Sequence, residues 1–496
     1  MRERISMKLH DMIRKIEKAE IIGNGNTEIF GLDYDSRRIK PGYLFAAVKG
    51  FKTDGARFIP NAVQNGAVAV MSEDSLDIEL PVVKVASVRR AMADAAAAFY
   101  DYPGTKLTNI GVTGTNGKST CVALVRNILE HDSKKCGMIN SLMYDTGKSR
   151  YKAERTTPDS VEMQKYLAEM VESGCTHASL EVSSHALVLN RVDNIDFKCG
   201  LFTTFSRDHL DFHRDMDDYL KAKQLLLERI DDPEKTAVVN ADVPEFAQFV
   251  GKASCRFVTY GIGSVDADVY AEEFAFHALF TDCTLKTPAG ENKIRLALPG
   301  RYNLSNCLGA IATGLALEVD FETVCRAMEE AAPVPGRFQP VDCGQPFGVI
   351  IDFAHTPDAL ARLCESAREL TDGRLLILFG CGGDRDRGKR PLMAEAASSN
   401  SDYALLTSDN PRTEDPRQII DDAVRGMVGD NYEVEQERTA AIEKIMQMAQ
   451  AGDTVLLAGK GAEEYQEIGT KRFPYSDYGE SVRVLRKLGY DKVHKQ

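Results

Sequence analysis

Short apolar runs, separated by polar turns and segments of helical period, recur along most of the chain. In the last third, four such runs predict strands: FGVIIDFA (347–354), GRLLILFG (373–380), YALLTSD (403–409) and DTVLLAGK (453–460). The same alternation fills residues 105 to about 335 and begins with a strand-like TKLTNIGVT (105–113). Because strands that alternate with helices form parallel sheets covered by helices, we expect an α/β fold in both regions.

The first 104 residues have a different pattern, with short strands and turns before a closing helix. Strands are predicted within 35–50, 65–73 and 80–87, and a helix over RRAMADAAAAFYDYP (89–103). Residues 1–20 place Ile5, Leu9, Met12, Ile13 and Ile16 near helical spacing, which predicts an amphipathic helix. Breaks at Pro103-Gly104 and at PVPG (333–336) then predict three domains, 1–104, 105–335 and 336–496.

Composition narrows the class of protein. No window reaches about 18 uninterrupted apolar residues, so we expect no membrane insertion, and the charged N-terminus lacks the apolar core of a signal peptide. The 11 cysteines are scattered singly with no C-x-x-C pair, which favours reduced thiols and a cytoplasmic location. A net charge of −13 argues against nucleic-acid binding.

The stretch GVTGTNGKSTCVAL (111–124) has the order of a phosphate-binding loop: strand, glycine turn, lysine, hydroxyl, helix. The usual spacing would need glycine at 112, where Val112 stands. Lys118 would bridge the β- and γ-phosphates of a nucleotide, and a hydroxyl of Ser119 or Thr120 would bind Mg²⁺. A plain turn needs glycines alone, so the lysine and the two hydroxyls favour nucleotide binding.

Four further residues have ordinary explanations when taken one by one. Glu181 ends the strand-like start of ASLEVSSHAL (178–187) and could hold Mg²⁺, but a lone edge glutamate is usually solvated. His209 and His213 stand four apart, yet Leu210 occupies the glutamate position of H-E-x-x-H, which makes zinc a poor interpretation. Lys223 lies on a predicted helix, where a solvated lysine is the default.

Two polar loops follow predicted strands in the last region. GCGGDRDRGKRP (380–391) combines glycines with arginines and could enclose an anion. SDNPRTEDP (408–416) offers Asp409, Asn410 and Arg412 around Pro411, groups of both signs that suit a zwitterionic ligand. Either loop alone could simply cap a sheet, and two at strand ends of one domain favour a binding site.

Taken together, the motifs resemble those of the Mur ligases of peptidoglycan precursor synthesis. They are, in order, GTNGKST, TTPDS, LEVSSHAL, RDHLDFH, LPGRYNLSN, VPGRFQPV, DFAHTPDAL, GCGGDRDRGKRPLM, SDNPRTEDP and AGKGAEEYQ. GTNGK[ST] is that family's own phosphate loop, so Val112 is expected. The resemblance implies an N-terminal α/β UDP-sugar-binding domain, a central P-loop-type, mostly parallel ATPase domain and a C-terminal Rossmann-like domain for the amino acid.

The resemblance also implies a reaction. ATP would phosphorylate the D-glutamate γ-carboxylate of UDP-N-acetylmuramoyl-L-alanyl-D-glutamate, and the amine of an incoming amino acid would displace the phosphate. Such an enzyme needs ATP and Mg²⁺, and we expect it to be a monomer that acts on small molecules.

Residue roles carried over from the resemblance fall into four groups. ATP would be bound by Gly114, Thr115, Asn116, Gly117, Lys118, Ser119, Thr120, Asn303, Asn306, Arg337, Asp352 and His355. Mg²⁺ would be held by Ser119, Glu181, His209 and Lys223, the last as a CO₂-derived carbamate. The UDP-dipeptide would contact Ser36, Phe51, Lys52, Thr53, Thr156, Thr157, Ser183 and Arg191. The amino acid would contact Arg385, Asp409, Asn410, Pro411, Arg412, Gly459 and Glu463.

The D-N-P-R sequence marks the relatives that take meso-diaminopimelate. Arg412 would bind the distal carboxylate and Glu463 the distal ammonium, whereas the ammonium of L-lysine would meet Arg412 as a like charge. Leu189 and Ala462 depart from residues common in relatives, a glutamine and a histidine. Three alternatives stay open: an L-lysine-adding ligase, a folylpolyglutamate synthase-like ligase, and a P-loop regulator that binds nucleotide without catalysis.

Overall fold

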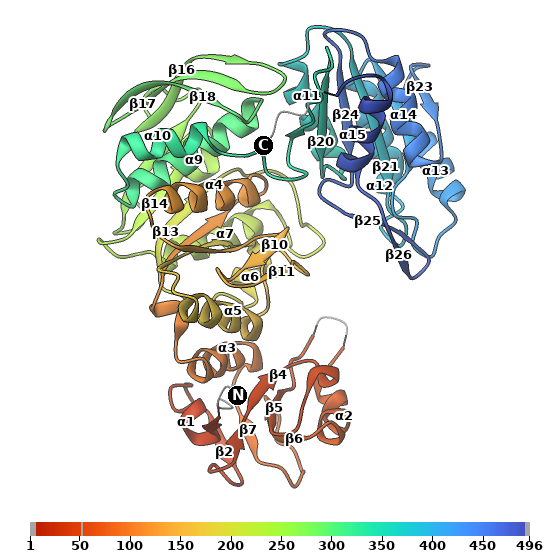
Figure 1. The fold of residues 1–496 in the computed structure, drawn as a ribbon. Coiled ribbons are helices and arrows are strands. Elements are labelled where there is room, and N and C mark those ends of the chain that lie inside the picture. The colour runs from red at the N-terminus through yellow and green to blue at the C-terminus, as the bar shows by residue number, and fades with distance from the viewer. Residues whose placement is uncertain (1–5, 51–52, 492–496) are drawn as a thin grey trace. The chain divides into compact units, whose positions relative to one another are not determined.

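The structure is a computed structural model that describes residues 6–50 and 53–491 (Figure 1). The chain divides into two compact units. One unit is Met1–Tyr260 with Ala312–Asp320, and the other is Gly261–Ile311 with Phe321–Gln496. This division runs through the predicted central domain, so the boundaries at 104/105 and 335/336 stay predictions. Each unit is built of α/β layers, as the alternating pattern predicted.

The N-terminal sheet has the order β2 (Glu20–Ile22), β7 (Val82–Lys84), β6 (Ala67–Ser72), β5 (Tyr43–Ala46) and β4 (Gly31–Asp33). Its helices are α1 (Leu9–Ile13), α2 (Ile59–Gln64) and α3 (Val88–Phe99). The helix predicted over 1–20 is wrong in extent, because Met7–Lys8 form β1 and pair with β3 (Glu28–Ile29). Ile5 lies outside the described residues, and Leu9, Met12 and Ile13 are buried as predicted.

The next sheet places β9 (Cys136–Ile139), β12 (His177–Glu181), β8 (Thr108–Thr113), β13 (Phe197–Phe202), β14 (Thr236–Asn240) and β15 (Arg256–Gly261) side by side in parallel. An antiparallel hairpin, β10 (Met143–Asp145) and β11 (Arg150–Lys152), extends its β9 edge. The chain between strands forms α4 (Lys118–His131), α5 (Ser160–Glu172), α6 (Ser184–Val188), α7 (Met216–Arg229) and α8 (Pro244–Ala247).

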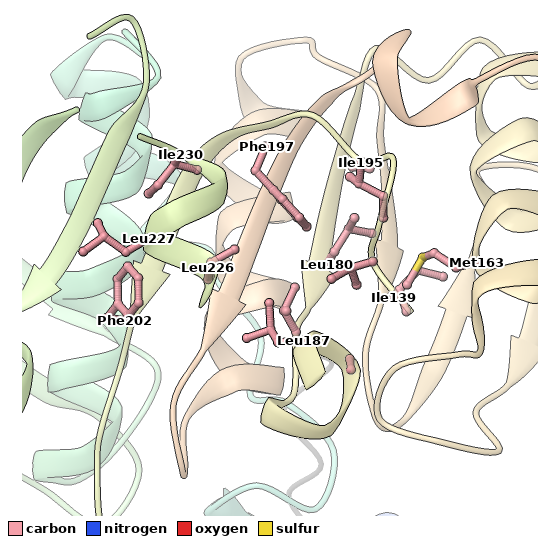
Figure 2. Packing of buried hydrophobic residues seen from close by; sticks show 14 of the residues in the cluster. Ile139, Met163, Leu180, Leu187, Ile195, Phe197, Phe202, Leu226, Leu227 and Ile230 are labelled. Carbon is pink, nitrogen blue, oxygen red and sulfur yellow. The ribbon is translucent and has the colours of Figure 1, made fainter. Parts of the chain in front are cut away.

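Apolar side chains from strands and helices fill one face of this sheet (Figure 2). Leu180 on β12 and Phe197 on β13 are wholly buried, as are Met163 on α5 and Leu226 on α7. Each such side chain contributes about 1.5–3 kcal/mol by leaving water. This packing fixes β12 and α7, the two elements that deliver Glu181 and Lys223.

The second unit begins with an antiparallel meander, β16 (Val269–Phe276), β17 (Thr281–Thr287) and β18 (Gly290–Leu296). Helices α9 (Arg301–Ala316) and α10 (Phe321–Glu329) follow along the chain. The predicted alternation for 105–335 is therefore wrong in this stretch, because hairpin connections between neighbouring strands replace helical crossovers.

The last sheet has the order β19 (Gln339–Pro340), β20 (Gly348–Asp352), β24 (Thr454–Ala458), β21 (Leu375–Cys381), β22 (Tyr403–Ser408) and β23 (Tyr432–Val434). From β20 to β23 all neighbours are parallel. Helices α11 (Pro357–Arg368), α12 (Lys389–Ser399) and α13 (Pro416–Val424) share one core cluster, and α14 (Arg438–Met448) and α15 (Asp477–Lys487) share another.

Parallel strands end at one edge of a sheet, so the segments after β20, β21, β22 and β24 gather there. Those segments contain the DFAHTPD, GCGGDRDRGKRP, SDNPRTEDP and AGKGAEEYQ stretches. A small hairpin, β25 (Tyr465–Ile468) and β26 (Lys471–Pro474), follows the last of them. In the described part of the chain, every helix is too short or too polar to cross a bilayer.

Candidate functional site: a phosphate loop and an amino-acid-sized cavity

The glycine loop joins β8 to α4, and close packing determines its shape. Gly117 has a φ of +84°, in the left-handed region that glycine favours. A Cβ on Gly114 would lie 1.9 Å from the Thr203 hydroxyl oxygen, so a larger residue is excluded there. Thr115 N donates to the carbonyl oxygen of Thr204 at 2.7 Å, and Asn116 N donates to the Thr204 hydroxyl at 2.9 Å. The loop is thereby held between the ends of two neighbouring strands.

Two residues of the glycine loop, Lys118 and Ser119, lie next to the Glu181 carboxylate. Glu181 ends β12 with 3% exposure, and its Oε2 accepts from the Ser119 hydroxyl at 2.8 Å and from Ser141 N at 3.0 Å. Lys118 Nζ donates to the carbonyl oxygens of Gly114 and Thr115 and lies 3.9 Å from Glu181 Oε1. The interpretation of Glu181 as a solvated edge residue is therefore wrong. Carboxylate and hydroxyl oxygens together are ligands that suit Mg²⁺.

Lys223 is also buried, with 1% exposure on the inner face of α7. Its Nζ donates to the carbonyl oxygen of Gly114 at 2.7 Å and lies 4.4 Å from the ring centre of Tyr219. Burial, reinforced by the cation of Lys118, lowers the pKa of Lys223 well below its usual value, which favours the neutral amine. The surface-lysine interpretation is wrong, since packing turns this residue toward the loop.

The histidines of RDHLDFH have different environments. His209 has a φ of +55°, and its ring meets that of His185 edge-on at 4.9 Å; burial lowers the pKa of His209. His213 is buried and its Nε2 lies 2.9 Å from the Ser184 hydroxyl. Among the described residues no group of three or more His, Cys, Asp or Glu side chains is arranged to hold a metal ion. The structure thus adds nothing in favour of zinc.

Several residues predicted to contact the dipeptide substrate meet beside Glu181. Thr157 Oγ1 donates to the carbonyl oxygen of Glu181 at 2.7 Å, and Ser183 N donates to Thr157 Oγ1 at 3.2 Å. Arg191 Nη1 donates to the carbonyl oxygen of Thr157 at 3.1 Å. Thr156 precedes this group, half-buried. The TTPDS and LEVSSHAL motifs therefore form one site with the phosphate loop.

Asp159 was missed by the sequence-based prediction, although it stands in TTPDS. Its carboxylate lies 2.9 Å from Arg191 Nε and accepts from the Tyr34 hydroxyl at 2.6 Å. It thus links the predicted substrate residue Arg191 to the N-terminal sheet. Ser36 begins a short 3₁₀ turn there, Thr53 is exposed, and Phe51 and Lys52 lie outside the described residues.

The other predicted nucleotide residues belong to the second unit. Asp352 ends β20, accepts from Phe338 N at 2.8 Å, and has its pKa raised by burial against the opposing effect of Arg337. The Arg337 guanidinium lies 5.0 Å from the ring centre of Phe353. His355 Nδ1 lies 2.8 Å from the carbonyl oxygen of Phe353. Asn303 and Asn306 are buried on α9, where Asn303 donates to the carbonyl oxygen of Pro299.

The residues predicted to bind the amino acid surround a cavity of about 490 Å³ at the carboxyl edge of the last sheet. Its lining includes Arg385, Asp409, Asn410, Arg412, Gly459 and Glu463. Pro411 packs closely against Gly383. A Cβ on Gly383 would lie 1.9 Å from the Pro411 carbonyl oxygen, so a larger residue is excluded there. Residues from three separate segments, which follow β21, β22 and β24, are therefore brought together.

Hydrogen bonds determine how Asn410 is oriented in this cavity. Its Oδ1 accepts from Lys460 Nζ and from Glu467 N, both at 2.9 Å. Its Nδ2 therefore faces Glu463 and donates to Oε2 at 2.8 Å. The Glu463 carboxylate lines the cavity, where an ammonium group could pair with it, and its Oε1 accepts from the Tyr465 hydroxyl at 3.3 Å.

The polar cavity-lining residues Lys389, Tyr465, Glu467 and Arg472 were missed from sequence, and so was Lys460, which contacts two lining residues. Lys460 is wholly buried, with Nζ 3.3 Å from both Asp409 Oδ1 and Glu463 Oε2. It follows β24 directly, so its strand-end position in AGKGAEEYQ was a usable signal. Tyr465, Glu467 and Arg472 come from the β25–β26 hairpin, which the hydrophobic pattern did not predict.

A glycine loop with a buried carboxylate beside it, and a polar cavity at the carboxyl edge of a mostly parallel sheet, fit an ATP-dependent ligase. The chain belongs to the Mur ligase family. It matches the family's catalytic domain over residues 28–100, the Mur ligase middle domain over 112–314 and the Mur ligase glutamate ligase domain over 336–461.

Individual relatives agree with this membership. A UDP-N-acetylmuramoyl-L-alanyl-D-glutamate–2,6-diaminopimelate ligase of Bacillus velezensis is 40% identical over 466 residues, 93% of this chain and 95% of the relative. The enzyme of that name from Clostridium tetani is 38% identical over 97% of this chain and 100% of its own length. A solved structure of a protein with that name has a TM-score of 0.70 at 30% identity and covers 98% of this chain and 99% of its own.

Proposed function

We propose that this protein adds meso-2,6-diaminopimelate to the γ-carboxylate of the D-glutamate in UDP-N-acetylmuramoyl-L-alanyl-D-glutamate at the expense of ATP. The proposal rests on one observation above all: the cavity in the last unit presents Arg412 and Glu463 together. The relatives described above bear the name of this activity over almost the whole chain.

The first step is phosphoryl transfer. An oxygen of the substrate carboxylate attacks the γ-phosphorus of ATP, and ADP leaves. The N–H groups of the glycine loop, the N-terminus of α4 and Lys118 would hold the phosphates and neutralise their charge. The Thr157, Ser183 and Arg191 group beside Glu181 would hold the accepting substrate next to the loop.

The second step makes the amide. The amine nitrogen of the amino acid attacks the acyl carbon, inorganic phosphate leaves with the C–O bonding pair, and the nitrogen loses a proton. A free carboxylate is unreactive toward amines, so phosphorylation supplies the leaving group. The protein's task is to position the amine and exclude water.

Mg²⁺ would supply charge neutralisation on the phosphates, and the residues present suit it. Ser119 and Glu181 contribute buried oxygens at the loop. By resemblance to the Mur ligases, His209 would be a further ligand, and Lys223 would act as a carbamate formed with CO₂. The support for the carbamate is the burial of Lys223 beside the loop, since a carboxylate there could serve a metal where an ammonium could not.

The choice of amino acid follows from the charges in the cavity. Diaminopimelate has a distal carboxylate for Arg412 and a distal ammonium for Glu463, whereas L-lysine has only the ammonium. We further propose domains at 1–104, 105–335 and 336–496 and a monomer that works in the cytoplasm. Buried free thiols at all eleven cysteines are compatible with that location.

The test is phosphate release from ATP and Mg²⁺ in the presence of the UDP-dipeptide, with meso-diaminopimelate, L-lysine or no amino acid. We expect release with diaminopimelate alone. Release with L-lysine instead would mean that the protein is a ligase but that Arg412 and Glu463 do not select diaminopimelate. Absence of release with either would leave a nucleotide-binding protein of another function.

A further inference from the structure

Glu467 lies in the amino-acid cavity beside the arginine that the proposed function assigns to the substrate. Its Oε2 is 3.2 Å from Arg412 Nε, and the side chains of the two residues are 20% and 19% exposed. The backbone pins the pair in place, because Arg412 N donates to the carbonyl oxygen of Glu467 at 3.0 Å and Gly469 N donates to that of Arg412 at 2.7 Å. The contact is therefore built into the junction of the hairpin and the loop.

This contact occupies donors that a substrate would need. A guanidinium binds a carboxylate best through two parallel N–H groups on one edge. Arg412 Nη1 already donates to the carbonyl oxygen of Gly383 at 2.7 Å, and Nε faces Glu467. A substrate carboxylate that binds the edge formed by Nε and Nη2 must consequently share that edge with Glu467 or displace it.

A second cation, Arg472, lies near the other oxygen of the Glu467 carboxylate. Arg472 Nε lies 4.0 Å from Glu467 Oε1, and its guanidinium stacks 4.4 Å from the ring centre of Tyr465. When Glu467 turns away from Arg412, its charge therefore still has a partner. Exchange between the two arginines lowers the cost of releasing Arg412 to a ligand.

We propose that Glu467 is an internal competitor for Arg412 and so a specificity-determining residue of this ligase. Its carboxylate pairs with the Nε edge of Arg412, and a distal carboxylate of diaminopimelate that binds this edge must displace it. The pair also softens the like-charge repulsion that L-lysine would meet at Arg412. This inference rests on the proposed function.

The test is steady-state kinetics of Glu467→Gln with each amino acid. Glutamine keeps the size of the side chain and an acceptor oxygen while removing the charge. We expect the KM for meso-diaminopimelate to fall by about two- to tenfold, in the range of a partly buried ion pair, with little change in kcat. Any turnover of L-lysine should fall in the same variant, because Arg412 then lacks its counter-charge.

Glu464→Gln is the matched control, since it removes an equal charge from an exposed position nearby that does not line the cavity. A general disturbance of the cavity would impair the turnover of both amino acids. Competition for Arg412 would instead lower the KM for diaminopimelate and reduce the turnover of L-lysine. An unchanged or raised KM for diaminopimelate in Glu467→Gln would overturn the inference. If the unmodified enzyme released no phosphate with diaminopimelate, the proposed function itself would fail, so the two failures are distinguishable.

Discussion

Lys223 Nζ donates a hydrogen bond of 2.7 Å to the carbonyl oxygen of Gly114, and this bond joins the middle of α7 to the glycine loop. Lys118 donates to the same carbonyl oxygen at 3.0 Å, so two lysines converge on one backbone group. Both amines would bear a positive charge in water, and their proximity is part of what lowers the pKa of Lys223. The shape of the loop and the state of Lys223 are therefore coupled.

Lys223→Ala should slow phosphate release by about 10²-fold or more, in line with the loss of a preorganised electrostatic group. If Lys223 works as a carbamate, short carboxylic acids added to the assay should restore part of the rate, because they can enter the space that alanine leaves. Lys221→Ala, at an exposed position on the same helix, is the control. Full activity without added acid would exclude Lys223 from the chemistry.

Glu181→Gln should reduce kcat by about 10²–10³-fold, because an amide keeps the shape but loses the charge that faces Ser119 and Lys118. We also expect the Mg²⁺ concentration needed for half-maximal rate to rise. A titration of the rate with Mg²⁺ in both proteins measures this. Glu172→Gln, on the exposed end of α5, should behave like the unmodified protein. An unaltered Mg²⁺ dependence in the Glu181 variant would remove this residue from the metal site.

Arg412→Lys should raise the KM for meso-diaminopimelate by about 10- to 100-fold, since a two-pronged guanidinium contact becomes a point charge. The bond from Nη1 to the carbonyl oxygen of Gly383 is lost as well. The KM for ATP should stay within about twofold of that of the unmodified protein, because Arg412 is not among the residues expected to bind ATP. Arg417→Lys, exposed on α13, serves for comparison, and equal kinetics in the two variants would show that Arg412 does not bind the substrate.

Lys460→Met should destabilise the second unit by about 3–5 kcal/mol, because it leaves Asp409 and Glu463 without their buried cation. Urea unfolding followed by hydrogen exchange on α12 and β22 would localise the effect. Lys471→Met, on the exposed strand β26, gives the cost of losing a surface lysine. Equal stability of the two variants would mean that Asp409 and Glu463 are neutralised by other groups.

The sequence predicted much of the site because strand ends mark positions in a parallel sheet. Asp409, Arg412 and Gly459 follow strands β22 and β24, and the structure places all three at one cavity. Glu467 and Arg472 could not be predicted in this way, since the hairpin that contains them has four exposed residues on one strand and no apolar pattern. The antiparallel meander β16–β18 was also missed, because strand-like runs do not reveal whether hairpin turns or helices connect them.

By itself the sequence determined the α/β class, the phosphate loop and the family resemblance, because local periodicity and spacing encode them. Tertiary structure alone decided that Glu181 and Lys223 are buried partners of the loop instead of solvated side chains. It also decided that Glu467 lines the amino-acid cavity and that Lys460 is buried against Asp409 and Glu463. Burial and pairing depend on which segments pack together, and a single side chain cannot specify its own dielectric environment or its counter-charge.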